Sequence, residues 1–527
     1  MKLQSGTYWL TRVVFLRCLA AIYNVAFLVA LNQNKQLLGR NGLLPVDLYL
    51  KDMHRRIGGD KYAQVSSIPT VLWFVNWEHL DFWLDTIAYC GLALSFAVLV
   101  TGASNIIAMT LLWALYHSLV NVGQRWYSFG WESQLLETGF LAIWLCPVVS
   151  WSRFPSHTPT PWVVIWGFRW LVFRIMFGAG LIKIRGDQCW RDLTCMDYHY
   201  QTQPVPNGNA YFMHQAPPLM HKIETASNHF SELLAPVLVL VPVRAICMTG
   251  GIIQLLFMGA IIVSGNLSFL NHLTMLPSVF CFDDKFLSCL FSSKTLQKVY
   301  KLQTSREPKS NGYYIRQVCN LSLAALLAYL SIPVVQNLLS RRQMMNTSFE
   351  PLRILNTYGA FGSVTKERTE VIMQGTLADN PEAKDAVWLE YEFKCKPGNI
   401  TRRPCYISPY HYRLDWLMWF AAFQNYQHNP WLIHLVAKML QNDEDVSKLI
   451  QHNPFLDEAP PKYVRLEHYL YEFTQLGSAE AKAGQWWNRR RIVFNKQRSR
   501  RPLNYVIIKF ELSGSRPIIC PTADKQQ

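Results

Sequence analysis

VVFLRCLAAIYNVAFLVAL, which spans Val13–Leu31, is the stretch of sequence that decides the class of this protein. It is almost entirely apolar, and it is long enough to cross a lipid bilayer as a helix. Arg12 and Arg17 lie at its start, and no small-residue cleavage site closes it. We therefore expect an uncleaved membrane-spanning helix here rather than a signal peptide.

Further apolar runs follow through the first 340 residues, and their number sets the expected number of membrane spans. Ile252–Val263 is too short to cross a bilayer alone, and Leu267–Phe282 is a weaker candidate. The sequence therefore predicts between five and nine spans. The other runs are Thr86–Val100, Ile106–Val122, Leu135–Val149, Val163–Ile184, Leu233–Thr249 and Leu321–Leu338.

Composition separates the chain into two parts. Half of its 527 residues are apolar and 16% are charged, against about 25% charged in soluble proteins. Charged residues return to an ordinary soluble level after residue 340. We expect a polytopic α-helical membrane domain at 1–340, with a polar loop at about 185–229, then a soluble α+β domain at 341–515 and a tail at 516–527. A purely soluble enzyme and a disordered chain are both excluded.

The formal net charge of +16 has a simple explanation in a membrane protein. Cationic loops fix the orientation of membrane spans, and no nucleic-acid-binding motif accompanies the charge. We therefore expect membrane lipids, and not nucleic acid, among the partners. The sequence also lacks a Gly-x-Ser-x-Gly hydrolase elbow and a glycine-rich phosphate loop, so neither a lipase nor a nucleotide cofactor is indicated.

The part after residue 340 alternates strand-like and helix-like segments. Their order predicts an antiparallel sheet with helices inserted or packed on one face. The expected strands are Thr369–Leu377, Trp388–Lys394, Tyr463–Phe473, Ile492–Phe494 and Tyr505–Leu512, and the expected helices are Leu414–Gln424 and Trp431–Leu440.

A polar helix face within the membrane half suggests two different roles. Two His-x-x-Glu pairs, His221 with Glu224 and His229 with Glu232, share one face of a predicted helix. Such pairs can hold a metal or move protons. The alternative, which we favour, is a polar face that packs into the bundle and pairs with Arg169 or Arg174, because four turns spread these groups over about 16 Å. No metal is therefore implied.

Two arginines, Arg169 and Arg174, lie inside the apolar segment Trp166–Gly178. A charge at membrane depth needs a partner or a route to the interface. Both arginines are expected either to face other protein segments or to lie near the membrane surface. The candidate partners are Glu137, Glu224 and Glu232.

Cysteines and glycosylation sequons bear on the compartment. Cys395 and Cys405 bracket a short loop that also contains the sequon at Asn399, and Asn346 begins a second usable sequon. We expect a Cys395–Cys405 disulfide, with Cys189–Cys195 as a second candidate pair, and both features suit an oxidising lumen. Arg341-Arg342, directly after the last span, favours the cytosol instead.

Several segments, in order along both halves, resemble the lipase maturation factor family. One is Phe168–Gly178, a second joins His199–Pro204 to Asn228–Leu233, and a third is Tyr391–Gly398 followed by Arg402–Cys405. The longest is Ser408–Ala422. One stretch departs from the family pattern: Gly265–Asn271 keeps the glycine and two asparagines of a Gly-Asn-Tyr-Asn-Phe-Phe-Asn signature but not its middle.

The resemblance implies a multi-pass protein of the endoplasmic reticulum whose C-terminal domain faces the lumen. Family members help secreted lipases, homodimers such as lipoprotein lipase, to fold into an active state, and they are not themselves lipases. The cysteines and sequons favour the lumen and Arg341-Arg342 favours the cytosol, and the resemblance decides between them in favour of the lumen. The alternative function is a membrane-embedded enzyme that acts on lipid or on a lumenal substrate through the His/Glu face.

The aromatic-rich stretch Tyr410–Ala422 is the most suggestive client-binding segment. Aromatic and arginine side chains dominate the energetics of protein interfaces. Tyr410, His411 and Arg413 precede a predicted helix and are the expected surface residues, whereas helical spacing favours a core position for Trp416. Trp419 completes the set of candidates.

Overall fold

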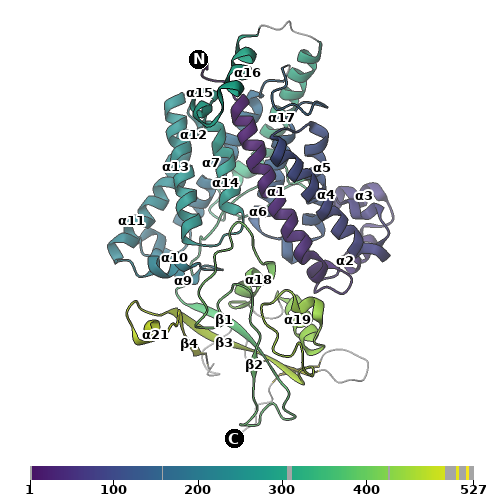
Figure 1. Ribbon diagram of the computed structural model, residues 1–527, viewed down its shortest axis with the longest axis vertical. Helices are drawn as coiled ribbons and strands as arrows, with labels where there is room; N and C mark the ends of the chain where they lie inside the picture. The colour runs from purple at the N-terminus through teal and green to yellow at the C-terminus, as the bar shows by residue number, and fades with distance from the viewer. Residues whose placement is uncertain are drawn as a thin grey trace.

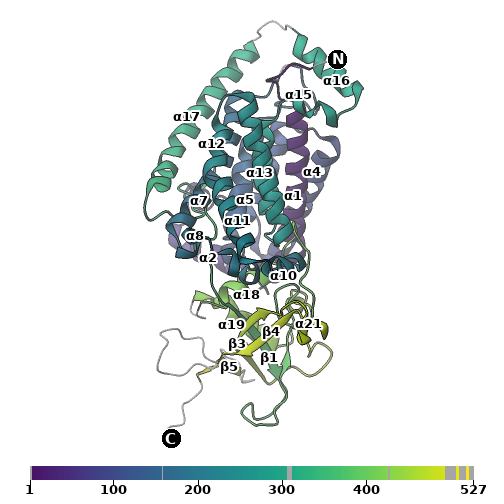
Figure 2. The same ribbon diagram turned by 90° about the vertical axis from the view of Figure 1, so that its left-hand side faces the viewer.

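The chain folds into a bundle of long helices with a smaller sheet domain at one end (Figure 1). The computed structural model describes residues 3–156, 158–305, 311–424 and 428–492, and two strands at 506–509 and 518–521. The bundle is the chain up to Leu339, and the sheet domain is the chain after it. The N-terminus lies at the end of the bundle opposite the sheet domain (Figures 1 and 2).

The helices of the bundle run between these two ends. Among the described residues, five are long and apolar enough to cross a membrane: Trp9–Leu38, Trp77–Thr101, Trp162–Arg185, Arg244–Ser264 and Gly312–Leu339. The bundle helices are α1 (Trp9–Leu38), α4 (Leu80–Thr101), α5 (Ile106–Val122), α6 (Gly130–Ile143), α7 (Trp162–Arg185), α11 (Pro218–His229), α12 (Ala235–Leu240), α13 (Arg244–Ser264), α14 (Leu270–Ser278) and α17 (Asn311–Leu339).

One predicted span boundary is wrong. The apolar runs were divided after Thr249, but the structure ends α12 at Leu240 and begins α13 at Arg244. Pro242 lies between them and cannot supply the amide that a continuing helix needs. The predicted short run Ile252–Val263 is thus the second part of α13 and not a separate segment.

The predicted polar loop at 185–229 is largely helical. A π-helical turn, Phe230–Leu234, joins α11 to α12, so that residues 218–240 form one continuous helix of about 35 Å. Gln254 of α13 donates to the Ser231 carbonyl, which lies within this turn. The shorter helices are α2 (Val46–Ile57), α3 (Lys61–Ser67), α8 (Gln188–Arg191), α9 (Met196–Thr202), α10 (Gly208–His214), α15 (Asp284–Leu287) and α16 (Ser293–Thr304).

The sheet domain contains the predicted antiparallel sheet with helices. The strand order is β2-β1-β3-β5-β6, and β4 pairs with β3 beside β5. The helices α18 and α19 lie on the side of the sheet that faces the bundle (Figure 2). The strands are β1 (Arg368–Thr376), β2 (Leu389–Glu390), β3 (Tyr463–Phe473), β4 (Trp487–Arg491), β5 (Val506–Lys509) and β6 (Ile518–Pro521), and the helices are α18 (Arg413–Ala421), α19 (Pro430–Leu440), α20 (Glu444–Ser447) and α21 (Ala479–Lys482).

The predicted strands agree best with the observed strands where apolar and polar residues alternate over many positions. The predicted Tyr463–Phe473 is β3, and β1 differs from its prediction by one residue at each end. Trp388–Lys394 shortens to β2, and β4 ends just before the predicted Ile492–Phe494, whose last two residues lie outside the described residues. The strand β6 pairs with β5 inside the stretch that was assigned to a tail.

The contact between α12 and α13 gives a test of the bundle. A Cβ added at Gly250 would lie 2.9 Å from the Cβ of Leu238 and 3.0 Å from the Val239 amide nitrogen. We expect Gly250→Leu to separate the two helices and to lower the stability of the detergent-solubilised protein by about 1–3 kcal/mol. The measurement is the midpoint of thermal aggregation.

The matched control for this test is Gly259→Leu on the same helix, where an added Cβ meets nothing within 4 Å. This variant should keep the midpoint of the natural protein. Equal losses in the two variants would contradict close packing as the cause.

Candidate functional site

Arg413 is fully buried where the sheet domain meets the bundle. Its Nη1 donates to Glu132 Oε1 at 2.7 Å and to the Trp126 carbonyl at 2.6 Å. Its guanidinium carbon lies 3.5 Å from the centre of the Tyr127 ring. Burial alone would lower the pKa of Arg413, but Glu132 raises it overall, so the side chain stays charged. The expectation of a surface position for Arg413 is wrong, because Glu132 on α6 supplies the countercharge that burial requires.

His411 is buried at the same junction, again contrary to the expected surface position. Its Nδ1 lies 2.8 Å from Ser268 Oγ, and its ring packs against Trp131 and Phe269 at centroid distances of 5.4 and 5.7 Å. Burial, and then Arg413, hold the pKa of His411 well below its ordinary value, so the ring is neutral. This histidine is therefore part of the packing between the two domains.

Gln33, near the end of α1, holds the backbone of this segment. Its Nε2 donates to the His411 carbonyl at 2.9 Å and to the Tyr410 hydroxyl at 3.1 Å, and its Oε1 accepts from the Arg413 amide at 2.9 Å. Tyr410 is half-buried and Trp416 is buried, as expected for Trp416. Trp419 is half-buried, and its indole donates to the Thr202 carbonyl at 3.0 Å. The five proposed client-binding residues thus form a docking segment between the domains.

Glu137 forms a second anchor on α6. One of its oxygens pairs with Arg174 of α7. The other accepts from the Tyr358 hydroxyl at 2.7 Å and from the Asn356 amide at 3.0 Å. Arg174 Nη1 also donates to the Asn356 carbonyl at 2.7 Å. The start of the sheet domain is therefore bound to a buried ion pair within the bundle.

Arg169 has no such carboxylate within the described residues. Its guanidinium donates to the Tyr8 hydroxyl at 3.0 Å and to the Phe280 carbonyl at 3.2 and 3.3 Å, and it lies over the Trp166 ring. The Tyr8 hydroxyl and the Phe280 carbonyl therefore bind Arg169 in place of the acidic partner that the sequence suggested.

The His/Glu face is divided among separate partners. His221 Nδ1 lies 2.8 Å from Asp197 Oδ1, and its Nε2 lies 3.0 Å from the Met213 carbonyl. Both nitrogens of His221 are therefore engaged. Glu224 accepts from the Tyr200 hydroxyl at 2.9 Å, and His229 Nε2 lies 2.9 Å from the Trp190 carbonyl.

Glu232, the last member of this face, forms a buried ion pair with Lys183 at 2.6 Å and accepts from Asn228. Across the described residues, no group of three or more His, Cys, Asp or Glu side chains is arranged to hold a metal ion. The four side chains of the face thus bind α10, α9, α8 and α7 rather than one another. This arrangement matches the packing alternative, but the expected partners Arg169 and Arg174 are wrong, because Lys183 takes Glu232 and Glu137 takes Arg174.

Comparison with known proteins assigns the family. Residues 10–289 match the model described as the lipase maturation factor transmembrane domain, and residues 354–495 match the lipase maturation factor C-terminal domain. The chain belongs to the lipase maturation factor family. No solved structure matches the chain.

Curated relatives match nearly the whole chain. Lipase maturation factor 1 of Bos taurus is 57% identical over 500 residues, which cover 93% of this chain and 89% of that protein. The Homo sapiens protein of the same name is 56% identical over 498 residues, covering 93% and 88%. Lipase maturation factor 2 of Xenopus tropicalis is 30% identical over 592 residues, covering 92% and 82%.

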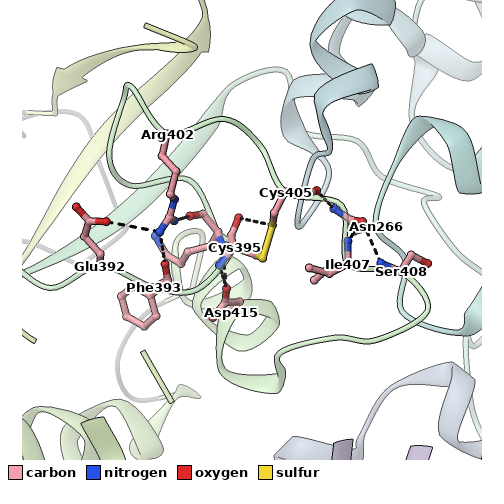
Figure 3. Close-up of a disulfide and its surroundings, with 10 residues drawn as sticks. Asn266, Glu392, Phe393, Cys395, Arg402, Cys405, Ile407, Ser408 and Asp415 are labelled. Atoms are coloured by element: carbon pink, nitrogen blue, oxygen red, sulfur yellow. Dashed lines mark hydrogen bonds and ion pairs between the residues drawn. A yellow bond between two sulfur atoms is a disulfide. The ribbon is translucent and has the colours of Figure 1, made fainter. Parts of the chain in front are cut away.

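The stretch Gly265–Asn271 touches the disulfide loop (Figure 3). Asn266 donates to the Cys405 carbonyl at 2.7 Å and accepts from the amides of Ile407 at 3.1 Å and Ser408 at 3.3 Å. Asn266 therefore fixes the disulfide loop to the bundle, and Ser268 of the same stretch contacts His411.

The structure pairs the cysteines as the sequence suggested. Cys395 is bonded to Cys405, and Cys189 to Cys195. Asp415 of α18 accepts from the Cys395 and Lys396 amides at 2.6 and 2.9 Å, so the disulfide loop is tied to the docking segment (Figure 3).

Both proposed glycosylation residues, Asn399 and Asn346, are exposed. Asn399 lies within the disulfide loop, and the Thr401 hydroxyl of its sequon donates to Asn399 Oδ1 at 2.8 Å. Asn266 also begins a sequon, but it is buried and hydrogen-bonded on both sides of its amide. It is therefore inaccessible to a glycan transferase in the folded protein.

The residues that receive the docking segment are not apparent from the sequence. Gln33 and Glu132 lie in or beside apolar runs, and Asn356 lies in an irregular segment. A signal was present for Glu132, because a carboxylate at the end of an apolar helix needs a countercharge. The identity of that countercharge was not available from local sequence.

The buried pair of Arg413 and Glu132 gives the second prediction. Arg413→Met leaves Glu132 buried without its countercharge, and we expect a loss of about 3–5 kcal/mol in stability. Cells should then contain much less of the protein, and limited proteolysis should release the sheet domain. The double variant Arg413→Met/Glu132→Gln should recover part of the loss because it removes both charges.

The control for this prediction is Arg490→Met, which changes an exposed arginine of the same sheet domain. It should leave abundance unchanged. If Arg413→Met instead has normal abundance and resists proteolysis, Arg413 is a surface residue and not a buried anchor.

Proposed function

We propose that this chain is a multi-pass protein of the endoplasmic reticulum membrane that assists the folding, dimer assembly and maturation of secreted lipases of the lipoprotein lipase type. The observation that carries the proposal is the match to both family models over most of the chain. The 57% identity to a protein named lipase maturation factor 1 supports the same role. No cofactor is part of the proposal.

A lumenal sheet domain is supported by where the cysteines are paired. All four paired cysteines of the described residues lie at the sheet-domain end of the bundle. Cys289, which follows α15 at the opposite end, is exposed and unpaired. Disulfides form in the lumen and not in the cytosol. The same orientation places both exposed sequons, at Asn346 and Asn399, in the lumen.

The charges of the opposite end agree with this orientation. The α15–α16 region carries exposed lysines beside the N-terminal end of the bundle: Lys285, Lys294, Lys298 and Lys301. Cationic segments next to membrane spans stay in the cytosol. Arg341 and Arg342 are also cationic but lie at the sheet-domain end, so charge alone favours the orientation less strongly. The proposed orientation therefore rests more on the disulfides than on the charges.

The proposed mechanism is physical rather than catalytic. A late folding intermediate of a secreted protein exposes apolar surface and unpaired strand edges, and transient burial of these prevents aggregation. The sheet domain is suited to this role because two buried anchors hold it at a fixed position on the bundle. The lipid-facing partner is the bilayer, which covers exposed apolar side chains such as Leu256 and Leu321.

The enzymatic alternative receives no support from the His/Glu face. His221 is engaged through both ring nitrogens, and Glu232 neutralises the buried Lys183. A general acid or base must reach the proton that it moves in a substrate. We therefore propose that this protein acts without a chemical step of its own.

The orientation of the sheet domain can be tested with glycosidases. In microsomes, the natural protein should shift in mobility after treatment with a glycosidase specific for high-mannose glycans, and Asn399→Gln should lose that part of the shift. The sheet domain should also survive added protease in intact microsomes. Digestion of the domain in intact microsomes would contradict the lumenal orientation.

The maturation role can be tested in cells that lack lipase maturation factors and express a secreted lipase. Adding this chain should raise the activity of the secreted lipase per unit of lipase mass. His229→Gln keeps a donor for the Trp190 carbonyl, so a folding factor should retain its effect in this variant. Loss of the effect at normal abundance would favour an enzyme that uses His229, and no effect of the natural chain would contradict maturation.

A further inference from the structure

The sheet domain has a hollow of about 510 Å³ beside the edge strand β2. The connection from β1 to β2 forms one wall, at the side of the domain away from the bundle (Figures 1 and 2). Phe455 lies buried at its floor, with its ring centre 5.8 Å from that of Tyr391. A Cβ at Gly375 would lie 2.5 Å from the Phe455 ring, so the floor is closely packed.

The walls of the hollow expose apolar side chains to water. Val387 is 69% exposed, Leu389 is 38% exposed and Leu377 is 39% exposed. These residues lie in the sheet domain, where no bilayer can cover them. Ala383 and Ala386 line the same hollow and leave room for side chains from another chain. A rimmed apolar hollow of this volume is typical of a binding site.

A short piece of sheet edge lies at the same place: Glu392, just beyond β2, is bridged to His452, so the open edge is β2 itself. The strand β2 is the end of the strand order, and within the described residues it pairs with β1 alone. An extended peptide can add to such an edge through main-chain hydrogen bonds, with its alternate side chains directed into neighbouring pockets. Val387 and Leu389 are two residues apart and therefore share one face at this edge.

The charge around the hollow is opposite in sign to the net charge of the whole protein. The chain carries a net charge of +16, yet the rim is predominantly acidic. The Asp379 side chain is 94% exposed and pairs with Lys462. Glu382 and Asp385 lie on the connecting wall, and Asp457 and Glu458 follow Phe455. Lys384 and Lys462 are the cations named here, so the five acidic groups outnumber the two basic ones.

We propose that this hollow and the outer edge of β2 bind an extended segment of a client chain, with apolar residues at alternating positions and lysine or arginine beside them. The apolar residues enter the hollow, the backbone pairs with β2, and the cations meet Asp385, because Asp379 is already paired with Lys462. The proposal rests on the proposed function, because it assigns a place on the sheet domain for the client.

The small size of this site fits a folding factor. The hollow has room for a few side chains, and contacts of this size give weak, reversible complexes. A client that completes its own sheet or its dimer interface buries the same segment and leaves. The site therefore favours an unfolded or partly assembled client over the finished protein.

The test uses the full chain in detergent micelles and a short fluorescent peptide of alternating valine and serine with lysines at both ends. Fluorescence anisotropy should show binding. Val387→Glu/Leu389→Glu should weaken this binding by about tenfold or more, a difference of about 1.4 kcal/mol. The matched control is Leu476→Glu, which changes an apolar residue of the same domain that is 56% exposed and lies outside the hollow. It should bind as the natural protein does.

Charge specificity is tested with the same peptide carrying glutamates in place of lysines. It should bind the natural protein at least about tenfold more weakly. Asp385→Lys changes one exposed residue of the wall and should not affect folding. It should weaken the binding of the lysine peptide and strengthen the binding of the glutamate peptide, so that the difference in affinity between the two peptides becomes smaller. Failure of the lysine peptide to bind, equal binding of the two peptides, or unchanged binding by the double variant would each overturn the proposal.

Two other possible occupants of the hollow, the chain's own C-terminal end and a second copy of the chain, would give different results. Removal of residues 522–527 would increase peptide affinity if the chain's own end filled the hollow. Self-association that the double variant abolishes would assign the hollow to a second copy. Either result overturns a client site.

The lipase assay separates this proposal from the proposed function. If the double variant loses both peptide binding and lipase maturation, both proposals stand. If it loses peptide binding but matures lipase fully, the hollow is not the client site, although the maturation role stands. If the natural chain does not mature lipase, the proposed function itself fails.

Discussion

The buried ion pair of Arg413 and Glu132 is the interaction on which the arrangement of the two domains depends. Both side chains are completely buried, and Glu132 also accepts from the Tyr116 hydroxyl and from the Trp131 indole. A buried pair contributes little net stability over an apolar pair of the same shape, but neither charge tolerates the loss of the other. The pair therefore specifies where the sheet domain docks more than it adds to stability.

The second anchor on α6 makes this joint rigid. Glu132 binds the docking segment, and Glu137 binds the start of the sheet domain together with Arg174. Two attachments at different points of one helix remove the freedom that a single contact would leave. A domain fixed in this way presents the same face away from the bundle at all times.

The sequence predicted the class of fold well and the roles of single residues poorly. Long apolar runs and the alternation along β3 are local patterns, and the structure matches both. The segment Tyr410–Trp419 shows the limit. Aromatic side chains and arginine are common in exposed binding sites and equally in buried domain interfaces, so composition could not distinguish the two. The partners Gln33, Glu132 and Ser268 lie in three different helices or loops of the bundle.

The sequence by itself determined that the chain has membrane-spanning helices followed by an antiparallel sheet domain, and it favoured a disulfide between Cys395 and Cys405. Segment length and periodicity are sufficient for the first conclusion because each acts over neighbouring residues. Only the tertiary structure decided what the charged residues do. Arg413 and Glu132 are separated by 281 positions in the chain, and a countercharge at that distance is selected by the packing of the whole bundle. The same holds for Glu232, whose partner Lys183 lies on another helix.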